Sequence, residues 1–507
     1  MKKVIQISAV VASLSFLSLP SLAFDLPGGF TPPPGYTPPS GTDSGIILPP
    51  GVTPPSGGSF PSFEDILKNL PPDAPIPSAP AAGFEDYLKF RDQLGAIDPT
   101  TLRSITPEEM AKFTPKDISK LSPEAAKGFT PDQLGSLKPD VLKNFSPEQF
   151  ANIPPTAFKE LDPKQVDKLP PALIKQLEAT DISQLPLDAL RSFDPNQVKV
   201  LPAAAAAGIS DEQIKAFAGK VFAALPPGFI SQLSPDALGG LDPAQLKAMA
   251  INQIKSLSAA QLSEITPATI KSMIPAQVKG LLPAAIEGMI DEQIAQLSPS
   301  VLKSFSTAQF QALTPEALEG LLPVQFRALG APQIKALDAE ATAALDPKTF
   351  GVLSPVQAKA LSPLAVPGIS AEQLATLGPN SFKAFAPTQI DALTPAAIGG
   401  MTDKQLQSMA AGQLKALDAS QFGAVGPSAL AALSAKQMDS VVPTTLAGLS
   451  PEQAGVLAPK TVGSMDAKQL AALELETLDA LTAEQIKAIP ASVISALDPA
   501  KAAALAN

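Results

Sequence analysis

Apolar residues return every eight positions through most of the chain. A series that begins at Ile97 continues without insertion to Leu505. A second apolar residue lies five places after each of these, as Leu102 follows Ile97, and Thr342 is the only polar exception in this second series. We call each eight-residue unit an octad, with the first apolar residue at position 1 and the second at position 6.

A period of eight fits neither one continuous helix nor a strand. Eight residues of α-helix turn through about 800°, so the apolar positions would spiral around the helix by about 80° per octad. In a strand, the odd gaps of five and three would send apolar side chains to both faces. Frequent proline also disfavours strands. The pattern therefore predicts a short helix that ends and restarts in every octad.

The polar residues of the octad fit the start of such a helix. In the octad FSPEQFAN, Ser146 is a good N-cap residue, and Pro147 takes the first helical position, where its missing N–H costs nothing. Gln149 completes a capping box with Ser146. Phe145 and Phe150 flank the cap as a hydrophobic staple does. We therefore assign Ser146, Pro147 and Gln149 a structural, capping role.

Helices this short are not stable alone and must bury their two apolar positions against neighbouring octads. We predict an all-α solenoid of very short capped helices, one per octad, over residues 97–507. Gln stands at position 5 in alternate octads, so we further predict two unlike helices in each 16-residue coil. The members of this series include Gln133, Gln149, Gln165, Gln197, Gln213, Gln245, Gln261, Gln277, Gln293 and Gln309.

A longer period of ten octads lies over this pattern. It relates LSPEAAKGFTPDQ at position 121 to LPAAAAAGISDEQ at position 201, and it indicates either duplication of a long block or a superhelical turn. Five glycines share position 8 of the octad with this spacing: Gly128, Gly208, Gly288, Gly368 and Gly448. We interpret them as structural, as helix ends or points of close packing, in preference to ligand contacts.

The N-terminal residues 1–23 have the features of a secretory signal peptide. Lys2 and Lys3 precede an apolar stretch, and small residues stand where a signal peptidase cleaves, between Ala23 and Phe24. The alternative is a membrane anchor, but the apolar stretch is short and interrupted by serines and a proline. No later segment is long and apolar enough to span a membrane, so we expect export through the general secretory route.

Two further segments separate the signal peptide from the octads. Residues 24–62 are rich in Pro and Gly and are predicted to form an extended, disordered linker. Residues 63–96 contain two short amphipathic stretches. We expect these to be short helices, the second of which caps the N-terminal end of the solenoid.

Composition removes several classes of chemistry. The 507 residues include no Cys and no His, and the two tyrosines, Tyr36 and Tyr87, lie outside the octads. Without these residues the chain lacks thiol nucleophiles, the commonest metal ligand and the usual general base near neutral pH. The formal net charge of -11 disfavours nucleic acid as a partner. We predict a non-enzyme with no catalytic residue, metal or cofactor.

The octads FSPEQFAN, LTAEQIKA and LSAAQLSE resemble the L-[ST]-x-x-Q-[IV]-x-x arrays of very large bacterial surface proteins, often labelled adhesion or haem-utilisation proteins. The resemblance covers about four fifths of the chain and implies an exported surface or matrix protein. This chain is far shorter, is richer in proline and lacks glycine-aspartate calcium repeats. Because it has no His or Cys, we do not expect haem use.

The sequence thus favours an exported, non-enzymatic repeat protein. It would act as a structural rod, spacer or adhesive scaffold at the bacterial cell envelope or in the extracellular matrix. Its partners would be proteins or envelope and matrix components, including further copies of itself. The alternative is a solenoid binding module for a peptide, glycan or lipid, in the periplasm or outside the cell, and a continuous apolar groove would favour it.

Overall fold

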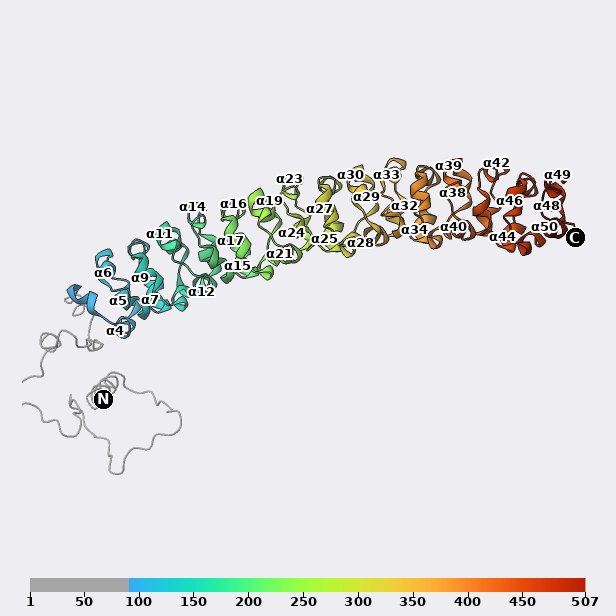
Figure 1. Ribbon diagram of the computed structural model, residues 1–507. Coiled ribbons are helices and arrows are strands. Elements are labelled where there is room, and N and C mark those ends of the chain that lie inside the picture. The colour runs from blue at the N-terminus through green and yellow to red at the C-terminus, as the bar shows by residue number, and fades with distance from the viewer. Residues whose placement is uncertain (1–90, 507) are drawn as a thin grey trace, which may run out of the picture. The chain divides into compact units, whose positions relative to one another are not determined.

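The computed structural model describes residues 91–506, and every regular element in this range is helical (Figure 1). The chain divides into two compact units, Met1–Leu169 (unit 1) and Pro170–Asn507 (unit 2). The all-α solenoid of short helices is therefore confirmed. The predicted signal peptide with Ala23 and Phe24, the linker, and residues 63–90 of the expected cap lie outside the described residues.

Unit 1 contains a series of α-helices and 3-10 helices (η) joined by short connections. They are η1 (Arg91–Ala96), α4 (Pro99–Arg103), α5 (Pro107–Met110), α6 (Pro115–Lys120), η2 (Ala125–Gly128), α7 (Pro131–Ser136), α8 (Pro139–Leu142), α9 (Pro147–Ala151), η3 (Pro155–Glu160) and α10 (Pro163–Asp167).

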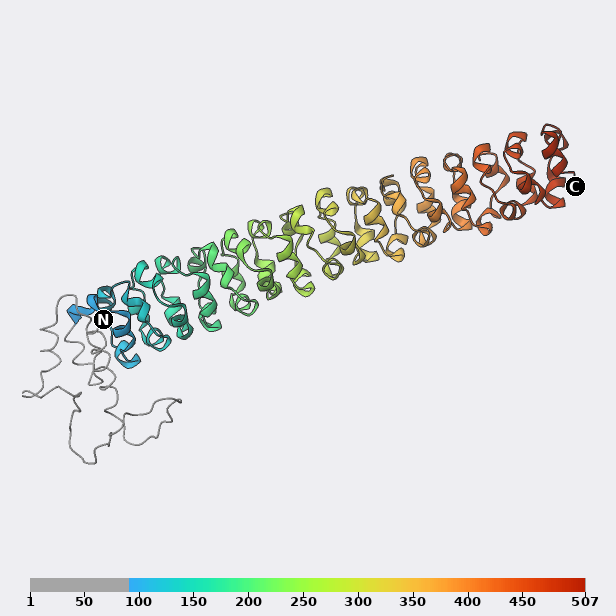
Figure 2. The ribbon, with the colours of Figure 1, turned by 60° about the horizontal axis from the view of Figure 1, so that its bottom comes forward.

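Unit 2 continues the series, and Figures 1 and 2 both show its helices as one stack in chain order. They are α11 (Pro171–Ile174), α12 (Ala179–Gln184), α13 (Leu187–Arg191), α14 (Pro195–Val198), η4 (Ala203–Gly208), α15 (Asp211–Ala216), α16 (Gly219–Phe222), α17 (Pro227–Gln232), α18 (Pro235–Gly239), α19 (Pro243–Ala248), α20 (Ile251–Lys255), α21 (Ala259–Glu264), α22 (Pro267–Ile270), α23 (Pro275–Val278), α24 (Pro283–Ile286), α25 (Asp291–Gln296), α26 (Pro299–Leu302), α27 (Thr307–Gln311), α28 (Pro315–Glu319), α29 (Pro323–Ala328), α30 (Ala331–Ala336), α31 (Ala339–Ala343), α32 (Pro347–Gly351), α33 (Pro355–Ala360), η5 (Val366–Gly368), α34 (Ala371–Thr376), α35 (Pro379–Lys383), α36 (Pro387–Asp391), α37 (Pro395–Ile398), α38 (Asp403–Ser408), α39 (Ala411–Leu414), α40 (Ala419–Gly423), α41 (Pro427–Leu430), α42 (Ala435–Met438), α43 (Pro443–Leu446), α44 (Pro451–Gly455), α45 (Pro459–Val462), α46 (Ala467–Ala471), α47 (Leu475–Asp479), α48 (Ala483–Ala488), α49 (Ala491–Ile494) and α50 (Pro499–Ala504).

Each α-helix begins at position 3 of its octad, where the octad chemistry predicts, whereas the 3-10 helices η2 and η5 begin two and three residues later. In α9, Ser146 is the N-cap with an extended backbone, and Pro147 is the first helical residue. The rings of Phe145 and Phe150 meet edge to face with centroids 6.4 Å apart, which is the contact expected of a hydrophobic staple. The next proline requires an extended residue before it, so the helix ends within its own octad.

Positions 1 and 6 form the core of both units. Leu102 is fully buried and Ile105 is 4% exposed, and the same alternation continues octad after octad. Thr342, the polar residue of the second series, is also fully buried, and its hydroxyl donates to the Asp338 carbonyl at 2.7 Å. One turn of helix per octad therefore suffices to turn both apolar positions inward.

The size of a coil differs from the prediction. Helices in contact lie three octads apart, as α4 with η2 in unit 1 and α18 with α21 in unit 2. Two helices per 16-residue coil is therefore wrong, because that arrangement would bring every second octad into contact. The alternation of unlike octads is a period of the sequence, and one coil takes at least three octads.

The recurrent glycines mark close approaches between coils. At Gly208, an added methyl group would overlap the carbonyl oxygen of Ala179 in the preceding coil. Gly128 in unit 1 has the same relation to Pro99. Gly288, Gly368 and Gly448 meet Ala259, Ala339 and Ala419 in the same way. Position 8 in these octads is thus restricted to glycine by the backbone of the preceding coil.

We predict that Gly208→Ala lowers the stability of the surrounding octads by about 2–3 kcal/mol, since the methyl group must push apart two backbones. Gly412→Ala is the matched control, because the only atom near its added methyl group is a proline carbon of Pro387 at 3.7 Å. Within α39 it should be neutral or stabilising by about 0.5–1 kcal/mol. Hydrogen exchange of the neighbouring amides measures both effects, and equal losses would contradict the close-packing role.

Candidate functional site

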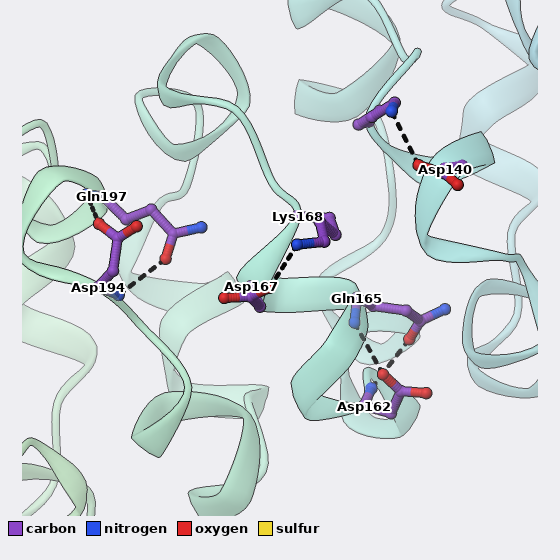
Figure 3. Close-up of polar contacts among 8 residues, drawn as sticks. Asp140, Asp162, Gln165, Asp167, Lys168, Asp194 and Gln197 are labelled. Atoms are coloured by element: carbon purple, nitrogen blue, oxygen red, sulfur yellow. Dashed lines mark hydrogen bonds and ion pairs between the residues drawn. The ribbon is translucent and has the colours of Figure 1, made fainter.

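The buried glutamines at position 5 are the main polar feature of the solenoid. Their side-chain Oε1 accepts the backbone N–H of the N-cap residue, three residues earlier. Ser146 N–H donates to Gln149 at 2.7 Å, and the Ser146 hydroxyl accepts the Gln149 N–H at 3.1 Å. The predicted capping box is therefore present. Figure 3 shows two more, Asp162 with Gln165 and Asp194 with Gln197.

The other end of each glutamine amide bonds to the preceding coil. Gln149 Nε2 donates to the carbonyl oxygens of Ile118 at 2.8 Å and Leu121 at 2.5 Å, which belong to the C-terminal end of α6, four octads earlier. In unit 2, Gln261 Nε2 makes the equivalent bonds to Ile230 and Leu233. At such a helix end, the last carbonyls lack the usual N–H partner four residues later, although Ile118 also accepts the Leu121 N–H at 3.1 Å. One amide thus caps the start of its own helix and the end of another.

Only glutamine has the length and the donor–acceptor pair that both contacts require. Its side chain is almost fully buried, with Gln165, Gln245 and Gln405 having no exposed surface. A buried amide of this kind is tolerated because each of its polar atoms has a partner. The sequence predicted the capping half of this arrangement and missed the bond between coils, since the accepting carbonyls carry no residue-type signal.

Hydroxyl residues at position 5 make a shorter version of the same bond. The Thr269 Oγ1 donates to the Leu241 carbonyl at 2.8 Å, and Ser381 donates to that of Leu353 at 2.5 Å. Four more threonines bond in this way to the position-1 carbonyl three octads earlier: Thr349, Thr445, Thr461 and Thr477. Their recurrence among the octads between the glutamines was the signal that could have revealed this contact.

A carboxylate occupies position 5 at Asp181, which is 8% exposed. Burial raises the pKa of the Asp181 carboxyl above its ordinary value, against the lowering effect of the Glu178 backbone N–H that it accepts at 2.8 Å. The neighbouring Glu178 charge raises this pKa further. The ionised form is therefore less favoured in the folded protein than in water.

Charged residues elsewhere form exposed local pairs. The Lys143 ammonium donates to Asp140, which Figure 3 labels, at 2.8 Å and lowers the pKa of that carboxyl. Both side chains are exposed. Lys168 pairs with Asp167 at 2.9 Å, which raises the pKa of the lysine. Such exposed pairs contribute little to stability.

Within residues 91–506, no three Asp, Glu, His or Cys side chains lie close enough together to hold a metal ion. The helices of that part of the chain also include none that is long and apolar enough to cross a membrane. Of the residues predicted to be structural, those of the capping box and the glycines all serve helix starts or contacts between octads.

Several large apolar side chains are exposed in unit 2, and four of them share one position of the octad. Ile274, Leu282, Ile290 and Leu322 stand at N-cap positions, where most octads have Ser, Thr or Asp, and they are 38–44% exposed. They make no side-chain cap. These substitutions fall in the middle of unit 2 and give its surface an apolar character that the sequence pattern alone did not reveal.

Comparisons with known proteins add no family. No family model and no curated protein matches the chain. Among solved structures, the one described as APUM23-GGAGUUGACGG is similar over 83% of this chain and 92% of that chain, with 13% sequence identity and a TM-score of 0.17. This low TM-score supports no inference about function.

We predict that Gln309→Glu destabilises the solenoid at pH 7 by about 3 kcal/mol, through lost hydrogen bonds and a carboxylate placed against two carbonyls. In the native chain Gln309 Nε2 donates to Val278 and Leu281, each at 2.7 Å. Low pH should restore part of this stability, because a protonated carboxyl can donate. Urea unfolding at pH 7 and pH 4 measures the loss.

The control for that experiment is Gln311→Glu in the same helix, α27. Gln311 is exposed and carries the identical substitution without a buried contact. Its effect should stay within about 0.5 kcal/mol. Similar losses for Gln309→Glu and Gln311→Glu would show that the bond between coils does not support the fold.

We predict that Asp181→Asn stabilises the protein at pH 7. Because the folded pKa of Asp181 is raised, the stability linked to its protonation is present at acidic pH and is lost as pH rises through that pKa. The gain from Asn should therefore shrink as pH falls toward 4. Lys143 lowers the pKa of the native Asp140 carboxyl, so Asp140→Asn should lower the stability at pH 7, by a smaller amount than Asp181→Asn raises it. Thermal melts across this pH range would reject the assignment if the two variants followed the same trend.

Proposed function

We propose that this protein is an exported, non-enzymatic repeat protein that acts as a rod, spacer or adhesive scaffold at the bacterial cell envelope or in the extracellular matrix. The observation that carries the proposal is the repetition of one polar contact, from the amide of position 5 to the end of a helix four octads earlier. It recurs from Gln213 to Gln485 in unit 2. A stack in which each octad bonds only to near neighbours can be lengthened without redesign.

Export is supported by the N-terminal sequence. Residues 1–23 have the charge, apolar stretch and small residues of a secretory signal peptide, and residues 24–62 have the composition of an extended linker. A linker of this kind between an attachment point and a stack would suit a protein that spaces or presents partners. Proteins, envelope components, matrix components and further copies of this chain are the proposed partners.

A binding module is the second candidate. The apolar side chains at Ile274, Leu282, Ile290 and Leu322 favour it, because exposed apolar groups at cap positions weaken the local helix start without serving the core. In that case a peptide, glycan or lipid would bind to a few particular octads. The two functions therefore differ in whether any one block of octads is indispensable.

Removal of residues 265–344 tests this difference. The deletion takes out ten whole octads, including the four apolar cap residues, and joins Glu264 to Leu345 with the octad and the glutamine alternation preserved. A spacer should keep its helicity per residue and its attachment to cells or matrix, and its maximum dimension by small-angle scattering should fall with the lost block. Complete loss of attachment with a folded, shortened stack would contradict the spacer and favour the binding module.

Export has its own measurement. Expression of the full chain in a bacterial host, followed by fractionation and N-terminal mass spectrometry, should give a protein outside the cytoplasm that begins at Phe24. A protein that accumulates in the cytoplasm with residues 1–23 intact would contradict the proposal.

A further inference from the structure

The series of glutamines in unit 2 is interrupted at one small residue. Position 5 of every second octad from Gln197 to Gln485 is Gln, except at Phe229 and Ala341. Phe229 fills its place with a fully buried ring. At Ala341 only a methyl group remains, although Gln261 and Gln421 stand at the same position ten octads before and after it.

The surroundings of Ala341 have not closed over the missing side chain. Alanines at position 5 of other octads are buried, as Ala317 and Ala397 at 1% exposure, whereas Ala341 is partly exposed. A cavity of about 230 Å³ lies beside it. This volume exceeds by several-fold the roughly 30 Å³ that one water molecule occupies in the liquid.

The residues that line the cavity include those whose backbone groups a glutamine would bond. They are Phe310, Gln311, Leu313 and Asp338. These four residues precede Ala341 by the same numbers of residues as the carbonyls and the N-cap N–H precede the glutamines that bond them elsewhere. Among the described residues, no side chain donates to these three carbonyls or accepts from the Asp338 N–H.

Gln421 shows how an amide satisfies the same groups. Its Oε1 accepts the Asp418 N–H at 2.9 Å, and its Nε2 donates to Leu393 at 2.6 Å and Ile390 at 3.0 Å. Asp418 and Leu393 are identical in type to Asp338 and Leu313, their counterparts ten octads earlier. The donor and the acceptors around Ala341 therefore have the arrangement that holds a primary amide further along the stack.

We propose that the cavity at Ala341 binds a primary carboxamide, either as a small amide or as the side chain of a Gln or Asn of another polypeptide. The carboxylates of Glu287, Asp338 and Glu340 also line the cavity, and no lysine or arginine does. This lining disfavours anions and favours groups that donate hydrogen bonds. A glutamine side chain extends beyond the alanine Cβ by a CH2–CONH2 group, and acetamide is the free molecule that corresponds to this group.

The test is a titration of the full-length protein with acetamide, followed through the amide resonance of Asp338 by TROSY NMR. We expect saturable shifts with a dissociation constant on the order of 10 mM, since a ligand of four heavy atoms gains at most a few kcal/mol. The tripeptide Gly-Gln-Gly distinguishes the sources: binding at least tenfold tighter than acetamide supports a polypeptide side chain, and weaker or equal binding supports a small amide.

Two variants control the titration. Ala341→Gln fills the cavity from within and should abolish the shifts at Asp338. Gln421→Ala removes the amide from the equivalent place and should create a second site, seen at the Asp418 resonance. If either variant fails to fold, the titration of the wild-type protein still tests the proposal.

Three results would overturn the proposal. The first is the absence of any saturable shift at Asp338 in the wild-type protein, and the second is an unchanged shift in Ala341→Gln. The third is a larger response to methylammonium than to acetamide, because the acidic lining would then hold a cation in place of an amide.

Discussion

The buried amide of the position-5 glutamine is the interaction on which the rest of this structure depends. Helices of one or two turns leave most of their backbone groups without intrahelical partners, and this solenoid repeats such ends in every octad. In Gln261, one oxygen satisfies a helix start and one nitrogen satisfies the end of another helix a coil away. The same amide therefore fixes the local helix boundary and the spacing between coils.

Other residue choices follow from that spacing. Where the preceding backbone comes closest, position 8 has to be glycine, as at Gly208 and Gly448. Where a shorter side chain faces the preceding coil, threonine or serine makes the bond, as Thr269 does. Each glutamine bonds the end of a helix four octads earlier, as Gln261 bonds Ile230, while the helices that pack together lie three octads apart.

The sequence was sufficient to predict the local structure. Ser146, Pro147 and Gln149 determine a helix start by short-range chemistry, so the octads, the capping boxes and the all-helical fold were predictable from their order alone. The number of octads in a coil was not predictable. It depends on which distant carbonyls the glutamine Nε2 groups reach, as Gln149 reaches Ile118 and Leu121. Because every residue has a backbone carbonyl, the sequence does not mark which ones are reached. The cavity at Ala341 was hidden for a related reason, since the residues that line it come from octads remote in sequence.

The most direct test of this account is the position of the glutamine side-chain amide protons in solution. NOE measurements on protein with labelled glutamine should place the Gln309 Nε2 protons next to Val278 and Leu281, with slow exchange against solvent. Rapid exchange, or contacts to a helix two octads earlier in place of four, would contradict a stack held together by these amides.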